Sequence, residues 1–171
     1  MSSFSSTSWI KVCPSSSLGD GERLHFEVES RYITIFRHRG VLSAIDSVCH
    51  HAGGPLTDGP LQEIEELGLT VVSCPWHRFL VSIDGIGSES NEAQTPPTLG
   101  GIKVYKGVEI VNGKPTESGW KKGKVVQRPH QVTEGEDGFV YINMNKGGTC
   151  VSDQDATNPL CGKQFELTPL S

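Results

Sequence analysis

Cys49-His50-His51-Ala52-Gly53-Gly54-Pro55-Leu56 and Cys74-Pro75-Trp76-His77 are the two motifs that decide the fold, and both lie between Val48 and Gly85. Each motif supplies one thiol and one imidazole, Cys49 with His51 and Cys74 with His77. Residues i and i+2 of an extended loop point the same way, and Pro75 favours a turn that brings residues i and i+3 together. Two sulfurs and two nitrogens suit zinc or an iron–sulfur centre.

The order of the ligands separates these two kinds of site. It reads C-x-H, then 22 residues (52–73), then C-x-x-H. A zinc finger usually places its two cysteines together and its two histidines together, whereas here each segment mixes both types. A Cys₂His₂ zinc site nevertheless stays open as an alternative.

The two segments, including the Gly-Gly-Pro-Leu run and the Cys-Pro-x-His run, resemble the ligand loops of the Rieske family. In that family a [2Fe–2S] cluster has two cysteines on one iron and two histidines on the other. The resemblance implies that Cys49 and Cys74 hold one iron and that His51 and His77 hold the other, at a solvent-exposed tip where electrons leave. His50 would then lie beside the cluster, outside the coordination sphere.

The rest of the chain is predicted to be nearly all β. Apolar residues alternate with polar ones with a period of two in several short segments bounded by turn residues. With the resemblance, this predicts an all-β, Rieske-type antiparallel β-sandwich or barrel with a small cluster-binding β subdomain inserted. We expect one domain over residues 1–171, with the subdomain at about 47–92 and less regular structure at 1–8 and 146–171. The predicted strands are Trp9–Cys13, Arg23–Val28, Tyr32–Arg37, Val41–Asp46, Leu69–Ser73, Phe79–Ile83, Val125–Val132 and Gly138–Ile142.

Three further segments carry local predictions. Apolar residues three apart at 60–67 indicate a helical turn or two. Lys106-Gly107 is expected to join two strands of a hairpin, and Asn112-Gly113 is a second turn signal. Pro96 and Pro97 are read either as a proline loop packed beside the ligand loops or as ordinary linker residues, and Phe165–Leu167 as an added edge strand.

Composition and charge limit the kinds of partner and the cellular location that we expect. The chain has 171 residues, a net charge of −5 and an isoelectric point near 5.6, so a nucleic-acid partner is not expected. The acidic surface could meet a basic patch on a redox partner or simply favour solubility. No apolar run approaches the roughly 18 residues of a membrane helix, and residues 1–8 do not read as a secretory signal. We expect a cytoplasmic protein without a membrane span, with an organellar location left open.

Two departures from the respiratory Rieske proteins, which this chain resembles in motif, bear on the reduction potential. Those proteins carry a disulfide between the two loops, at positions that here hold Gly54 and Trp76. They also have a serine and a tyrosine that donate hydrogen bonds to the cluster sulfurs, where this chain has Phe79 and Val81. Because such hydrogen bonds stabilise the reduced state, we expect a potential near the low end of the Rieske range of about −150 to +300 mV.

The function that the resemblance implies is electron transfer rather than catalysis. One electron would travel on a [2Fe–2S] cluster from a reductase to an oxidase- or oxygenase-type acceptor, and these redox proteins are the expected partners. Two alternatives stay open: a zinc-bound structural or interaction module, and a small subunit that feeds electrons into a larger reductase. Cys13, Cys150 and Cys161 are read as structural or incidental thiols.

Overall fold

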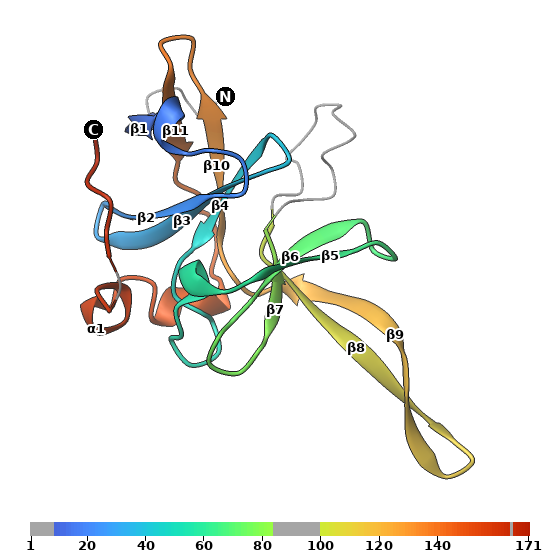
Figure 1. Ribbon diagram of the computed structural model, residues 1–171. Helices are drawn as coiled ribbons and strands as arrows, with labels where there is room; N and C mark the ends of the chain where they lie inside the picture. The colour runs from blue at the N-terminus through green and yellow to red at the C-terminus, as the bar shows by residue number, and fades with distance from the viewer. Residues whose placement is uncertain (1–8, 84–99, 165) are drawn as a thin grey trace.

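Two antiparallel sheets make up most of the computed structural model, which describes residues 9–83, 100–164 and 166–171. The strands of the six-stranded sheet are β1 (Trp9–Pro14), β2 (Arg23–Val28), β3 (Arg31–His38), β4 (Val41–Asp46), β10 (Pro129–Glu134) and β11 (Phe139–Asn143). They lie in the order β1-β11-β10-β4-β3-β2, so the first strand of the chain pairs with the last one (Figure 1). The predicted all-β antiparallel fold is confirmed.

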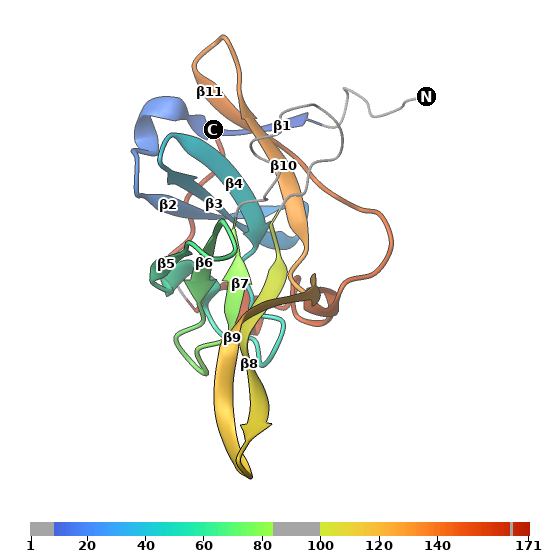
Figure 2. The ribbon, with the colours of Figure 1, turned by 90° about the vertical axis from the view of Figure 1, so that its right-hand side faces the viewer.

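The five-stranded sheet carries the second ligand motif. Its strands are β5 (Leu61–Ile64), β6 (Leu69–Ser73), β7 (Leu80–Ser82), β8 (Ile102–Val111) and β9 (Lys114–Val125), in sequence order across the sheet. The long β8–β9 hairpin extends away from the rest of the molecule in both views (Figures 1 and 2). The sheet therefore continues beyond the subdomain predicted at about 47–92. The extent of that subdomain and the assignment of the chain to one domain stay predictions, because residues 84–99 are not described.

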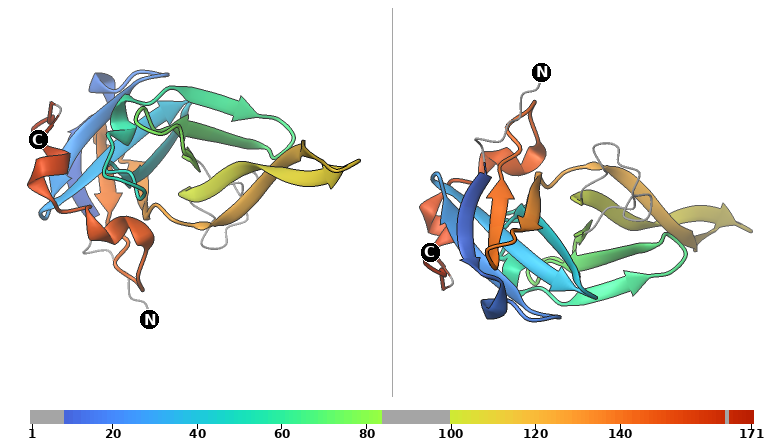
Figure 3. Two further views of the ribbon diagram at one scale, coloured as in Figure 1. Left: turned by 90° about the horizontal axis from the view of Figure 1, so that it is seen from below. Right: turned by 90° about the horizontal axis from the view of Figure 1, so that it is seen from above.

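The hydrophobic core explains why the sheets face one another. The alternation in β2 buries Phe26 and Val28 in a cluster within the six-stranded sheet. A second cluster joins the two sheets and contains Cys49 and Cys74 among aliphatic and aromatic neighbours that include Phe36, Ile45 and Val81. The thiols of both motifs thus belong to the packing that holds the two sheets together. Figure 3 shows the backbone of the two sheets from below and from above.

The helix predicted for residues 60–67 is wrong. Leu61–Ile64 forms β5, which pairs with β6 from Leu61↔Val72 to Ile64↔Leu69. The three-residue spacing of apolar side chains comes from a strand followed by a turn, in which Gly68 adopts a φ of +66°. Ile64 is buried with Leu69 and Val71, and this packing outweighs a short and weak helical pattern.

The turn predicted at Lys106-Gly107 is also wrong. Strand β8 continues through both residues, which pair with Trp120 and Gly119. Gly107 lies at a register shift instead of a turn. A Cβ there would lie 2.6 Å from the Lys121 and Ser118 side chains, so the position leaves little room for a larger residue. The chain reverses at Asn112-Gly113, where both φ angles are positive, as the second turn signal predicts.

The C-terminal segment consists of short helical turns. It contains η5 (Val151–Gln154) and α1 (Pro159–Gly162), and a one-turn helix η3 (Leu56–Asp58) occurs near the first motif. Residues 166–171 form no strand, although the Thr168 N–H donates to the carbonyl of His25 at 2.7 Å, so the predicted edge strand is wrong for the two residues described. Pro96, Pro97 and Phe165 lie outside the described residues.

A buried ionic network ties this segment to the six-stranded sheet. Asp46 is fully buried and accepts hydrogen bonds from Arg31 at 2.6 and 2.7 Å and from the Ser152 hydroxyl at 2.5 Å. Burial alone would raise the pKa of Asp46, but hydrogen bonds from Arg31 and His130 outweigh it and lower that pKa. Asp153 accepts from Arg128 and Arg31, which lowers its pKa as well. No helix in the described part of the chain is long and apolar enough to cross a membrane.

Candidate metal centre

The first ligand loop follows β4 and closes on itself within a few residues. The Cys49 N–H donates to the Gly54 carbonyl at 2.8 Å, and the Gly53 N–H donates back to the Cys49 carbonyl at 3.1 Å. Gly53 has a φ of +80°, which glycine adopts without strain. The loop therefore holds its backbone in a fixed shape with Cys49 at its base.

The second ligand loop joins β6 to β7 and closes in the same way. The Cys74 N–H donates to the Phe79 carbonyl at 2.9 Å, and the Arg78 N–H donates to the Cys74 carbonyl at 2.7 Å. Arg78 takes a positive φ of 62° to complete the turn that Pro75 begins. The two loops descend side by side from the sheets (Figure 1).

These loops bring the four predicted ligands together in two pairs. Cys49 and Cys74 are buried, whereas His51 and His77 are exposed. The two imidazole rings are 4.8 Å apart between centroids and nearly perpendicular. Both thiols thus lie on the inner side of the site, and both imidazoles lie on its outer side.

The two sulfurs interact directly. A hydrogen bond from the Cys49 thiol lowers the pKa of Cys74, and the same bond together with burial raises the pKa of Cys49. Thiolate is the form that binds a metal, so the lowered pKa of Cys74 favours the ligating form of that side chain.

Gly54 leaves room between the two loops. A Cβ at this position would lie 2.7 Å from the Cys74 sulfur and 3.2 Å from the Trp76 ring. Any larger residue would therefore push the second loop away from the first. Gly54, which stands where the respiratory Rieske proteins have a disulfide cysteine, thus allows the two thiols to lie close together.

His50 lies apart from the pair of exposed imidazoles. It is buried, its backbone N–H donates to the Gln127 Oε1 at 2.9 Å, and its Nδ1 lies 3.2 Å from the same oxygen. Its ring also meets the Phe79 ring edge-on at 5.7 Å. Burial lowers the pKa of His50. The His50 Nδ1 also lies 3.9 Å from the Cys49 sulfur. The place of His50 outside the ligand set stays a prediction.

The donor types and their pairing fit a Rieske-type cluster. Such a cluster needs two protein ligands for each iron, with sulfur and nitrogen on opposite sides. The inner pair of thiols and the outer pair of imidazoles provide that arrangement. Within the described residues, no three His, Cys, Asp or Glu side chains are arranged around a point where one metal ion could sit.

Comparison with known proteins decides the family. A family model described as soluble Rieske-type ferredoxin matches residues 11–147. The chain belongs to the soluble Rieske-type ferredoxin family. This membership supports an electron-transfer role and implies a [2Fe–2S] cluster.

Individual relatives agree with this assignment. A human Rieske domain-containing protein is 28% identical over 137 residues, which are 80% of this chain and 75% of that protein. The oxygenase subunit of carnitine monooxygenase from Acinetobacter baumannii is 27% identical over 91% of this chain, which spans only 36% of that subunit. The terminal oxygenase of carbazole 1,9a-dioxygenase from Novosphingobium sp. KA1 shares the fold, with a TM-score of 0.51, 18% identity, and coverage of 82% of this chain and 30% of that one.

Two residues that support the first ligand loop could not be identified from the sequence. The Gln127 side chain, 77 residues after His50, donates to the carbonyls of Asp46 and Val48 and so supports the first loop. Gln164 donates to the Gly53 carbonyl at 3.3 Å, and a Cβ on Gly53 would meet the Cys161 sulfur at 2.9 Å. Neither residue lies in a recognisable motif. Only the folded sheet brings them to the loop.

The remaining cysteines are all free thiols. Cys13 is buried in the core of the six-stranded sheet, and burial raises its pKa. Cys150 and Cys161 are half-buried in the C-terminal segment, where burial also raises the pKa of Cys161. That these three are structural or incidental thiols stays a prediction.

Proposed function

We propose that the chain carries single electrons on a Rieske-type [2Fe–2S] cluster held by Cys49, Cys74, His51 and His77. The observation that supports this most is the pairing of two buried thiols with two exposed imidazoles on neighbouring loops. When bound, such a cluster takes up and gives back one electron. The family membership and the order of the ligands in the sequence support the same proposal.

The residues of the chain would serve this role by shielding one side and opening the other. The buried thiols lie in the core cluster that joins the two sheets, where solvent has little access. The exposed imidazoles face outward, which shortens the path to a partner. Phe79 packs against His51 with 4.3 Å between ring centroids and holds that imidazole in place. Electrons would therefore enter and leave at the side of His51 and His77.

The proposed reduction potential is low for a Rieske centre. Phe79 and Val81 bring no hydroxyl to the second loop, and Val81 is fully buried. Fewer hydrogen bonds to sulfur destabilise the reduced state, so we expect a value nearer the low end of the range from about −150 to +300 mV. A redox titration that returned more than about +200 mV would contradict this part of the proposal.

The proposed partners are a reductase as donor and an oxygenase-type protein as acceptor. Relatives named as carnitine monooxygenase oxygenase subunits support the acceptor class, although the chain spans about a third of their length. We propose that the chain is a carrier and not itself an enzyme. A cytoplasmic location belongs to the same proposal and can be checked by cell fractionation.

The test is to count metals and record spectra on one purified sample. We expect a red-brown protein with two irons per chain and, after reduction with dithionite, the low average g value of a histidine-ligated cluster. Replacing Cys49 or Cys74 with serine, or His51 or His77 with alanine, should abolish this spectrum. The matched control His50→Gln should keep both irons.

Other outcomes would favour the alternatives. Colourless protein with one zinc, which stayed colourless after anaerobic reconstitution with iron and sulfide, would favour a zinc-bound structural module. A stable reductase that co-purified with the chain would instead favour a small electron-feeding subunit of a larger complex. Retention of iron in all four ligand variants would sink the assignment of the ligands.

A further inference from the structure

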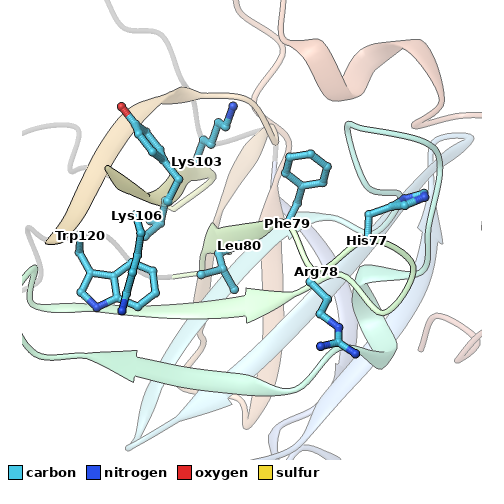
Figure 4. A pocket seen from close by; sticks show the side chains of 9 residues that line it. His77, Arg78, Phe79, Leu80, Lys103, Lys106 and Trp120 are labelled. Atoms are coloured by element: carbon cyan, nitrogen blue, oxygen red, sulfur yellow. The ribbon is translucent and has the colours of Figure 1, made fainter. Parts of the chain in front are cut away.

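An open groove of about 450 Å³ begins beside His77. One wall comes from the second ligand loop, with His77, Arg78 and Phe79. The other wall comes from the β8–β9 hairpin, with Lys103, Lys106 and Trp120. His77 lies at one end, and Lys106 and Trp120 lie at the other (Figure 4). We call this feature the His77 groove.

The groove carries positive charge at several points. Arg78, Lys103 and Lys106 line it. The Lys103 ammonium lies 5.9 Å from the centre of the Phe79 ring, and the Lys106 ammonium lies 4.9 Å from the Trp120 ring. These ring contacts hold the cations in position without neutralising them.

Little negative charge opposes these cations. Lys106 pairs with Glu117 at 3.3 Å, with both side chains exposed. Across the described residues, Arg78 and Lys103 take part in no ion pair. The hairpin from residue 102 to residue 125 holds six lysines and two glutamates, although the whole chain has a net charge of −5. The groove is therefore a basic region on an acidic protein.

An exposed apolar strip continues from the groove toward the hairpin turn. Beyond the register shift at Gly107, Val108 and Ile110 alternate along β8 and so lie on one face of the hairpin. The exposed fraction is 63% for Val108 and 67% for Ile110. A charged groove next to exposed apolar side chains is the composition of a protein-binding surface, and it offers more contact area than a small anion would use.

We propose that the His77 groove docks an acidic surface of the redox protein that exchanges electrons with this chain. This inference rests on the proposed function, because a partner must approach the side of His51 and His77. Opposite charges on the two surfaces would steer the encounter and set the orientation of docking. The net negative charge of the chain suggests a basic partner surface, whereas the positive charge of the groove calls for an acidic one.

The experiment measures binding of an acidic probe to the iron-loaded protein. The probe is a fluorescein-labelled peptide of eight glutamates, and its anisotropy is followed at 10 mM and 200 mM salt. The test variant is Lys103→Glu with Lys106→Glu. The control is Lys114→Glu with Lys163→Glu, which makes the same change in net charge at exposed positions outside the groove. A milder variant, Lys103→Gln with Lys106→Gln, covers poor folding of the first.

We expect the wild type to bind the peptide at low salt and to lose at least about tenfold in affinity at high salt, where screening is strong. The groove variant should lose at least about tenfold at low salt, the milder variant about threefold, and the control less than about twofold. Equal losses in groove and control variants would overturn the proposal, as would absence of binding by the wild type. Displacement of the peptide by equimolar citrate would also overturn it, because the groove would then select a small anion.

A second readout uses small oxidants of opposite charge. Reduced protein should be oxidised by ferricyanide, which takes one electron, more slowly in the groove variant than in the control. With hexaamminecobalt(III), which is cationic, the order should reverse. Iron content and spectra of the same samples separate the two proposals. Protein without a cluster would contradict the proposed function. Iron-loaded protein that is oxidised at the same rate in all variants would contradict only the proposed docking surface.

Discussion

Replacing Gln127 with methionine tests the support of the first ligand loop. Gln127 is fully buried, and its amide makes all its contacts with residues that lead into the loop. Its Oε1 accepts from the His50 N–H at 2.9 Å, and its Nε2 donates to the carbonyls of Asp46 and Val48 at 3.0 and 2.5 Å. Methionine has nearly the same length and volume and keeps the packing, but it offers no strong hydrogen bond.

The expected loss follows from these contacts. The substitution removes the hydrogen-bond partner of the His50 backbone N–H, of the His50 Nδ1 and of two carbonyls, all in a buried place. Each unsatisfied group costs about 1–3 kcal/mol, but carbonyls can find other partners and the losses do not add fully. We therefore expect a decrease of about 2–4 kcal/mol in the free energy of unfolding, out of a total of about 5–15 kcal/mol for a domain.

Urea denaturation measures this free energy, and hydrogen exchange shows where it is lost. Faster exchange should be confined to the segment from Asp46 to Leu56, because Gln127 bonds to the backbone there. The control Gln131→Met replaces an exposed glutamine on β10, whose side chain accepts a hydrogen bond from Asn143 at 3.1 Å, and should change stability by less than about 0.5 kcal/mol. A loss below about 0.5 kcal/mol for Gln127→Met, or faster exchange spread over both sheets, would refute the reasoning.

Three further predictions concern the backbone, pH and the potential. Gly101→Ala should lower the free energy of unfolding, measured by urea denaturation, by at least about 3 kcal/mol, because φ is +88° and a Cβ would lie 1.9 Å from the Gln127 carbonyl oxygen. The control Gly123→Ala, whose Cβ would have no neighbour closer than 3.5 Å, should change it by less than about 1 kcal/mol. The pKa values of Asp46 and Asp153 are lowered in the folded state, so both carboxylates stabilise the fold above about pH 4, and this contribution is lost as the pH falls further. Asp153→Asn should therefore make the free energy of unfolding depend less on pH in the acid range. An unchanged pH dependence would contradict the prediction. Phe79→Ser should raise the reduction potential by on the order of 50 mV in a redox titration, while Phe79→Ala, which lacks the hydroxyl, should not.

The order of strands along the chain could be predicted well from the sequence, because their signals are local. The period-two alternation of Arg23–Val28 and the run Leu69–Ser73 coincide with β2 and β6. The helix predicted near Ile64 and the turn predicted at Gly107 failed for a shared reason. In both places long-range pairing, with β6 or with β9, overrides a short local pattern.

The candidate ligands could be named in advance because two of them occur in each short motif. What surrounds them could not be. Gln127 and Gln164 reach the first loop from distant parts of the chain, and nothing in their local sequence marks them. The basic groove beside His77 was hidden for a related reason, since net charge is an average over the chain and only the fold places Lys103 and Lys106 beside the second loop.

The distance in sequence between the ligand loops and Gln127 has a consequence for biogenesis. Gln127 follows His50 by 77 residues, so at about 5–20 residues per second a ribosome makes it about 4–15 s later. Once His77 has been made, 50 residues before Gln127, the thiols and imidazoles of both loops exist, but the side chain that supports the first loop does not. The native shape of the site is therefore complete only after β9 has been synthesised. A cluster that requires the native shape of the first loop would therefore be inserted after these strands have been synthesised.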